Sequence, residues 1–226
     1  MTLVKICGIT NVEDALAATE AGASLLGFNF YAKSPRCVTV EDARRIIEQL
    51  PETVLCVGVF VNDDVEGVAR VASASGVGAV QLHGDETQEF CARLRQLSKL
   101  KTDGGFIIKA LRVGRDFSVE DAARFDVEAV LLDAYARDAW GGTGRTFDWA
   151  VARRARAVVP KLILAGGLTA ENVTRAVETV RPYAVDVCSS VENAPGRKSF
   201  QLMRSFVEAV RAAEGVRMKD EGGRME

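Results

Sequence analysis

The sequence has only one histidine, and its five cysteines include no C-x-x-C pair. Zinc sites and disulfide frameworks both need clustered or paired ligands, so we expect neither a metal nor structural disulfides. No apolar run reaches the roughly 18–20 residues of a membrane-spanning helix. The formal net charge of −2 lacks the positive excess that binds nucleic acids or acidic membranes. These absences favour a small molecule as the partner.

The N-terminus passes directly into a strand-like apolar run, without the order of charged, apolar and small residues that marks a signal peptide. An odd number of cysteines also fits reduced thiols better than a secreted disulfide framework. We therefore expect a soluble cytoplasmic protein that binds neither nucleic acid nor membrane.

Short apolar runs alternate with helix-length amphipathic segments along the whole chain. The runs are nearly continuous in apolar character, as in parallel strands that are covered on both faces. Eight of them can be distinguished: Leu3–Cys7, Leu25–Phe30, Val54–Val61, Ala79–His83, Phe106–Leu111, Ala129–Asp133, Leu162–Ala165 and Ala184–Cys188. The pattern predicts the α/β class and a single (β/α)8 TIM barrel. A doubly wound open sheet is the alternative, but no G-x-G-x-x-G follows the first run.

Helix starts carry a repeated signal in which a capping residue precedes acidic residues, as at Asn11, Thr39, Ser118 and Thr169. We assign residues 1–214 to the barrel, as one catalytic domain. Residues 215–226 are charged and lack a sustained apolar face, so we expect a disordered polar tail there.

Polar residues stand at or near the ends of several predicted strands, where barrel enzymes carry their active sites. Cys7 precedes a helix start whose N–H dipoles favour a thiolate, which can act as base or nucleophile; a small buried core residue is the alternative. Asp133 ends a fully apolar run and suits a general acid, or else a structural hydrogen bond to the following loop. His83 either orients a substrate or bonds its own loop, and Asp186, inside its strand, either contacts substrate or supports the structure.

Two loops suit the binding of an anion, because they follow the seventh and eighth strands, where barrels commonly hold phosphate. Gly166 and Gly167 allow backbone N–H groups to come close to a phosphate, and Ser189 and Ser190 add hydroxyl donors. Arg36 leaves the second strand toward the same end and can hold a carboxylate, unless it is a solvated surface arginine.

Seven segments together resemble the phosphoribosylanthranilate isomerase family. They are Lys5–Thr10, Ser34–Arg36, Gln81–Asp85, Leu131–Asp133 with Gly141–Trp149, Leu164–Leu168 and Asp186–Glu192. The resemblance implies a cofactor-independent Amadori rearrangement, in tryptophan biosynthesis, of the phosphorylated substrate N-(5-phosphoribosyl)anthranilate to 1-(2-carboxyphenylamino)-1-deoxyribulose 5-phosphate. It implies that Asp133 protonates the ribose ring oxygen and that Cys7 removes the proton from the neighbouring carbon.

The same resemblance assigns substrate binding to further residues. Arg36 would hold the anthranilate carboxylate, Asp186 the polar atoms of the substrate, and the glycine and serine loops the phosphate. The loop that contains Gly142 and Gly144 would exclude water, and His83 is placed among the substrate-binding residues.

One departure lies in the last motif, where the family usually has serine and glycine at the positions of Cys188 and Ser190. Because serine lacks the backbone freedom of glycine, Ser190 is expected to offer phosphate a hydroxyl instead of a close backbone approach.

A phosphosugar isomerase of histidine biosynthesis is one alternative function, although an aspartate would then be expected in place of Cys7. A non-catalytic barrel that binds a phosphorylated metabolite is another. The sequence leaves open a monomer or a homodimer.

Overall fold

The computed structural model describes residues 1–97, 106–114, 117–134 and 147–222, with side chains up to residue 214. Eight parallel strands pair in chain order and close into a barrel. They are β1 (Leu3–Cys7), β2 (Leu25–Asn29), β3 (Leu55–Phe60), β4 (Ala79–Leu82), β5 (Phe106–Val113), β6 (Ala129–Ala134), β7 (Leu162–Leu164) and β8 (Ala184–Val187). The predicted (β/α)8 barrel is therefore confirmed.

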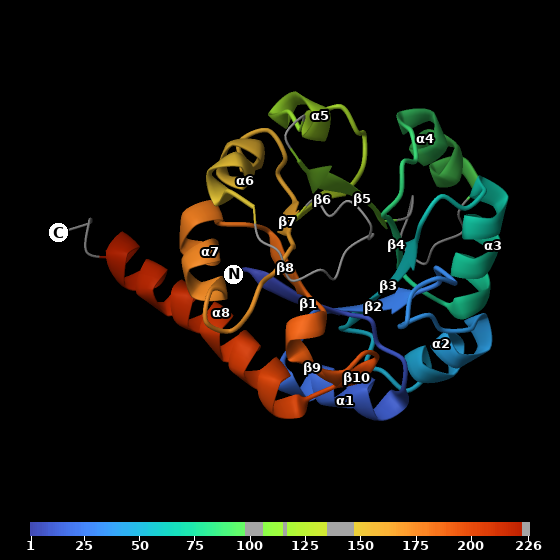
Figure 1. Cartoon of the computed structure of the whole chain (residues 1–226), viewed down its shortest axis with the longest axis horizontal. Helices are drawn as coiled ribbons and strands as arrows, with labels where there is room; N and C mark the ends of the chain where they lie inside the picture. The colour runs from blue at the N-terminus through green and yellow to red at the C-terminus, as the bar shows by residue number, and fades with distance from the viewer. Residues whose placement is uncertain (98–105, 115–116, 135–146, 223–226) are drawn as a thin grey trace.

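One helix follows each strand and packs on the outside of the barrel, as Figure 1 shows. These helices are α1 (Val12–Ala21), α2 (Val40–Ile47), α3 (Val65–Ser75), α4 (Gln88–Leu97), α5 (Val119–Ala123), α6 (Trp149–Arg156), α7 (Val173–Val180) and α8 (Phe200–Gly222). Among the described residues, no helix combines the length and apolar character that crossing a membrane requires.

The apolar strands serve two cores at once, because successive side chains of a strand point to opposite faces of the sheet. In β6, Leu131 belongs to the cluster that fills the barrel, while Val130 and Leu132 belong to the larger cluster between strands and helices. Both faces are thus buried, which explains why the strand sequences are continuous apolar runs rather than alternating ones.

The predicted capping residues Asn11, Thr39 and Ser118 each accept a hydrogen bond from a backbone N–H in the first turn of the helix that follows. Thr169 differs, since α7 begins only at Val173. The Asn172 side chain bonds the preceding loop instead: its Oδ1 accepts from Thr169 N at 2.9 Å, and its Nδ2 donates to the Gly167 carbonyl at 2.9 Å. This residue therefore braces the loop after β7.

Two features at the C-terminal end of the chain differ from the sequence-based expectation. The short 3-10 helix η1 (Ser189–Val191) leads into a hairpin of β9 (Glu192–Ala194) and β10 (Arg197–Lys198), which the sequence did not predict because its strands are so short. Helix α8 continues to Gly222, into the segment expected to be a disordered tail. Arginine, methionine, lysine and glutamate are good helix formers, so a helix already fixed by packing propagates through them.

Candidate active site

A cavity of about 340 Å³ opens at the carboxyl ends of the barrel strands. Nine of the predicted site residues line it: Cys7, Arg36, His83, Asp133, Gly166, Gly167, Asp186, Ser189 and Ser190. Gly142 and Gly144 lie outside the described residues. Side chains from loops far apart in the sequence are thus brought to one space, as expected for a barrel.

Cys7 ends β1 above a buried ion pair. Lys5 and Asp186 are register partners on β1 and β8, and Lys5 Nζ lies 2.8 Å from Asp186 Oδ1. The Lys5 side chain is 0% exposed. On the other side, a Cβ atom at Gly27 of β2 would lie 2.7 Å from Cys7 Sγ, so a glycine is needed there to make room for the thiol. The sequence analysis had not placed Lys5 in the site.

The Cys7 thiol has a pKa well below its usual value. A hydrogen bond with Cys188 is the largest cause, burial opposes it, and the positive charges of Lys5 and Lys198 act in the same direction as the hydrogen bond. The pKa of Cys188 is correspondingly raised, by the hydrogen bond to Cys7 and by burial. Of the two thiols, Cys7 is thus the one that loses its proton more readily, and Cys188 is the one that donates the hydrogen bond.

Burial disfavours the charged forms of both Asp186 and Lys5, but its weight in the net pKa shift differs between them. Burial raises the pKa of Asp186 to about 7, and the charge of Lys5 only partly offsets this. Burial also disfavours the Lys5 ammonium, but the negative charges of Asp186 and Cys7 prevail, and the pKa of Lys5 is raised. The lysine therefore remains a positive charge that acts on the Cys7 thiol.

Asp133 lies on β6 with its side chain against His83. The residue is 5% exposed, and its Oδ1 accepts a hydrogen bond from Ala134 N at 2.8 Å. His83 Nε2 lies 3.3 Å from Asp133 Oδ2, near enough for a charge interaction, but without a hydrogen bond to any described residue. Gln81 Nε2 lies 2.8 Å from His83 Nδ1. With the Gln81 amide as donor, neutral His83 carries its proton on Nε2, facing Asp133.

The loops after β7 and β8 form one wall of the cavity. Gly166 and Gly167 have φ values of +86° and +61°, which glycine adopts most readily. A Cβ atom at Gly166 would lie 2.6 Å from Ala134 N, so a side chain there would collide with the end of β6. Ser190 Oγ donates to the Leu168 carbonyl at 2.5 Å, which commits its proton within the protein rather than to a phosphate. The backbone N–H groups of these loops are the better candidates for phosphate donors.

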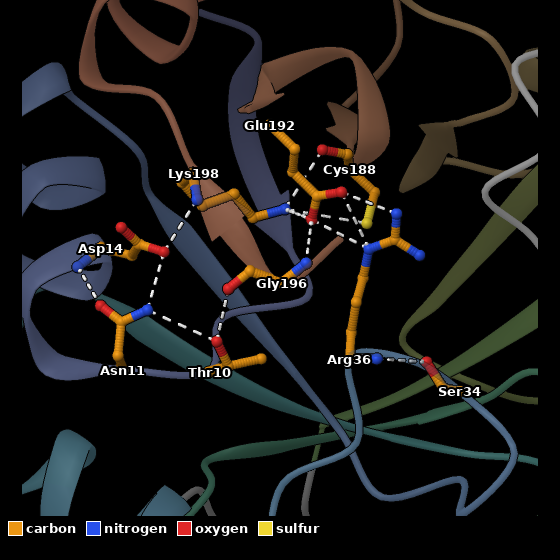
Figure 2. A network of polar contacts seen from close by, with 9 residues as sticks. All are labelled: Thr10, Asn11, Asp14, Ser34, Arg36, Cys188, Glu192, Gly196 and Lys198. Atoms are coloured by element: carbon orange, nitrogen blue, oxygen red, sulfur yellow. Dashed lines mark hydrogen bonds and ion pairs between the residues drawn. The ribbon is translucent and has the colours of Figure 1, made fainter. Parts of the chain in front are cut away.

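Arg36 forms an ion pair with Glu192, an acidic residue that the sequence analysis did not single out. Its Nε donates to Glu192 Oε1 at 2.9 Å, and its Nη2 donates to Oε2 at 2.7 Å (Figure 2). Lys198 Nζ donates to the same carboxylate at 2.8 Å. Lys198 gave no sequence signal, whereas Glu192 ends the last motif of the resemblance and could have been noted there.

No group of three or more His, Cys, Asp or Glu side chains within the described residues is arranged to hold a metal ion. The cavity instead brings together a thiol on β1, a carboxyl group on β6 and the loops after β7 and β8. Together with the barrel, a cavity of this kind at the carboxyl ends of the strands is typical of a (β/α)8 enzyme.

Comparison with known proteins assigns the family. The family model described as N-(5'phosphoribosyl)anthranilate (PRA) isomerase matches residues 4–209. The chain belongs to the phosphoribosylanthranilate isomerase family, which consists of isomerases.

Individual relatives cover nearly the whole chain. The N-(5'-phosphoribosyl)anthranilate isomerase of Geobacter sulfurreducens is 50% identical over 207 residues, 92% of this chain and 97% of that protein. A phosphoribosyl anthranilate isomerase solved in complex with reduced 1-(o-carboxyphenylamino)-1-deoxyribulose 5-phosphate is 41% identical, with a TM-score of 0.81 over 94% of this chain and 100% of that one. Monomers generated from the dimeric Thermotoga maritima isomerase give the same identity, TM-score and coverage.

Proposed function

We propose that this chain converts N-(5'-phosphoribosyl)anthranilate into 1-(2-carboxyphenylamino)-1-deoxyribulose 5-phosphate, as a cytoplasmic step of tryptophan biosynthesis that needs no cofactor. The main support is that one cavity contains both Cys7 and Asp133, with the loops after β7 and β8 between their strands in the order of the barrel. Family membership supports the same reaction. The curated relatives, which match almost the whole chain, are named N-(5'-phosphoribosyl)anthranilate isomerase.

The reaction needs one proton donor and one proton acceptor on a sugar, which is what the cavity offers. Asp133 delivers a proton to the ribose ring oxygen, and the ring opens to a Schiff base. The Cys7 thiolate then removes the proton from the neighbouring carbon, which leaves an enolamine that tautomerises to the ketose. The low pKa of Cys7 supports this role, because only the deprotonated thiol can accept the proton.

Binding of the substrate divides among the walls of the cavity. The loops with Gly166, Gly167 and Ser189 receive the phosphate, with Ser190 bracing one loop against the other. Arg36 receives the anthranilate carboxylate. Asp186 contacts polar atoms of the sugar, and His83 orients the substrate. The loop with Gly142 and Gly144 excludes water; it lies outside the described residues and rests on the sequence alone.

The proposal predicts that Cys7→Ser and Asp133→Asn each lower kcat at least about 100-fold while the fold is kept, since each removes one half of the acid/base pair. Turnover is followed as the loss of anthranilate fluorescence from freshly generated substrate, and the fold by circular dichroism.

Two matched substitutions serve as controls: the exposed Cys37→Ser and the exposed Asp126→Asn are expected to retain near-normal kcat. Near-normal activity of either site variant would remove that residue from its role. If the wild-type protein binds the reduced product analogue but does not turn over substrate, the chain is a metabolite-binding barrel or acts on another aglycone.

A further inference from the structure

Glu192 makes contact with Arg36 but does not line the cavity. Its side chain is 4% exposed, whereas that of Arg36 is 14% exposed and belongs to the cavity wall. Figure 2 shows the carboxylate lying between the Arg36 guanidinium and the Lys198 ammonium. Glu192 is thus placed to act on a ligand only through Arg36.

The Glu192 carboxylate is fully occupied by donors. Oε1 accepts from Arg36 Nε at 2.9 Å, from Lys198 Nζ at 2.8 Å and from Gly196 N at 3.3 Å, and Oε2 accepts from Arg36 Nη2 at 2.7 Å. Burial disfavours its charge, but the hydrogen bonds of Arg36 and Lys198 prevail and lower the pKa of Glu192. The carboxylate is therefore a fixed negative charge against one edge of the guanidinium.

The hairpin of β9 and β10 sets the position of this charge. Lys198 and Glu192 are register partners across the hairpin. Lys198 N donates to Asp14 Oδ2 at 2.8 Å, and Thr10 Oγ1 donates to the Gly196 carbonyl at 2.6 Å, so β10 and the turn of the hairpin are attached to the segment around the start of α1 (Figure 2). The hairpin is consequently a rigid support for Arg36 rather than a surface loop.

The opposite side of Arg36 is confined as well. Gly8 has a φ of +79°, and a Cβ atom there would lie 2.5 Å from Arg36 Cδ. The stem of the arginine thus runs between the Gly8 backbone and the Glu192 carboxylate. A guanidinium has five N–H donors, and Glu192 uses the edge formed by Nε and Nη2. The end formed by Nη1 and the second Nη2 hydrogen is left for a planar carboxylate.

The cations of this wall already face negative groups of the protein. Lys198 Nζ donates to Glu192, and the charges of Lys198 and Lys5 also act on Cys7. The feature that selects a ligand is therefore the direction of the free edge of the Arg36 guanidinium, and not a surplus of positive charge.

We propose that Glu192 and Lys198 are positioning residues that orient Arg36 and thereby select an aglycone that carries a carboxylate. The assignment rests on the proposed function, because it takes the aglycone to be anthranilate. Neither residue touches the reacting atoms. Their substitution is therefore expected to change discrimination between ligands and KM more than kcat.

The test compares two ligands by isothermal titration calorimetry: the reduced product analogue with its carboxyphenyl group, and the same compound with an unsubstituted phenyl group. Wild-type protein is expected to prefer the carboxylated ligand. Glu192→Gln is expected to reduce that preference about tenfold or more, since a charge-assisted contact is lost. Binding of the phenyl ligand is expected to stay within about twofold of wild type, because the phosphate loops are untouched.

Three further variants make the outcome specific. The exposed Glu48→Gln, which removes a surface ion pair with Arg44, is the matched control and is expected to leave the preference unchanged. In an Arg36→Met background, Glu192→Gln is expected to have no further effect on the preference. Lys198→Met removes the ammonium that donates to the Glu192 carboxylate and is expected to lower the preference as well, so it provides an independent test if Glu192→Gln does not fold.

An unchanged preference in folded Glu192→Gln or in folded Lys198→Met would overturn the assignment of that residue. An equal loss of affinity for both ligands would also overturn the proposal, because it would indicate a general structural role. Failure of wild-type protein to bind either ligand would contradict the proposed function itself, and this outcome is visible before any variant is made.

Discussion

Two thiols at adjacent strand ends have pKa values that are shifted in opposite directions. Ile6 and Val187 are register partners on β1 and β8, and Cys7 and Cys188 are the residues that follow them. Both line the cavity. Their hydrogen bond lowers the pKa of Cys7 and raises that of Cys188, and Lys198 Nζ lies 3.8 Å from Cys188 Sγ. Cys188 is therefore a hydrogen-bond donor to the proposed base.

We expect Cys188→Ala to move the acid limb of the pH profile of kcat/KM to higher pH. Loss of the Cys188 hydrogen bond raises the pKa of Cys7, so the thiolate forms only at higher pH, and the activity that depends on it rises later. The profile is measured on the wild-type protein and on Cys188→Ala between about pH 5 and 9, a range that brackets an ordinary thiol pKa.

Cys188→Ser is the matched control, since its hydroxyl can still donate to Cys7, and its acid limb is expected to stay near that of wild type. The rate of alkylation of Cys7 by iodoacetamide, followed by peptide mass spectrometry, should shift with pH in parallel. An acid limb that does not move in Cys188→Ala would show that Cys7 does not depend on this hydrogen bond.

Among the elements, the loop between β7 and α7 connects backbone conformation to the site most directly. Gly166 lies between the end of β6 and the cavity, and Asn172 ties the same loop to α7 through Gly167 and Thr169. A Cβ atom at Gly166 would also lie 3.0 Å from Asp133 Oδ1. The loop thus lies against both the cavity and the proposed acid.

Gly166→Ala is expected to destabilise the protein more than Gly76→Ala, measured as the free energy of unfolding in urea. Both glycines have φ values near +80°, so both substitutions incur the left-handed penalty of about 1–2 kcal/mol. At Gly76 no atom lies within 4 Å of the added Cβ, whereas at Gly166 it meets the backbone of Ala134. The difference in the free energy of unfolding between the two variants therefore measures the cost of the contact between the added Cβ and the Ala134 backbone. Equal losses, with an unchanged KM for Gly166→Ala, would contradict this account.

At the scale of the whole molecule, the order of strands and helices followed from the sequence because it depends on local patterns. The apolar runs identified all eight barrel strands, and capping residues such as Asn11 and Ser118 identified helix starts. The candidate site followed as well, since the carboxyl ends of parallel strands converge in any such barrel. Cys7, Asp133 and seven other predicted residues indeed line one cavity.

What the sequence did not predict depends on contacts between distant segments. Lys5 and Lys109 lie within apolar strands, and only the structure shows the partners Asp186 and Glu86 that make their burial acceptable. Glu192 and Lys198 lie in a hairpin of very short strands whose register is set by contacts with the start of α1. Periodicity carries no information about such pairings.

We expect a monomer in solution. The described residues expose few large apolar side chains, namely Met1, Leu16, Leu97, Val158 and Leu202, whereas a stable interface usually buries about 1,200–2,000 Å² around an apolar centre. We therefore expect light scattering after gel filtration to give a mass close to 24.4 kDa, independent of loading concentration. A mass near twice that value, falling on dilution, would instead indicate a homodimer. In that case Leu16→Glu and Leu202→Glu would test whether the neighbouring helices α1 and α8 form its interface.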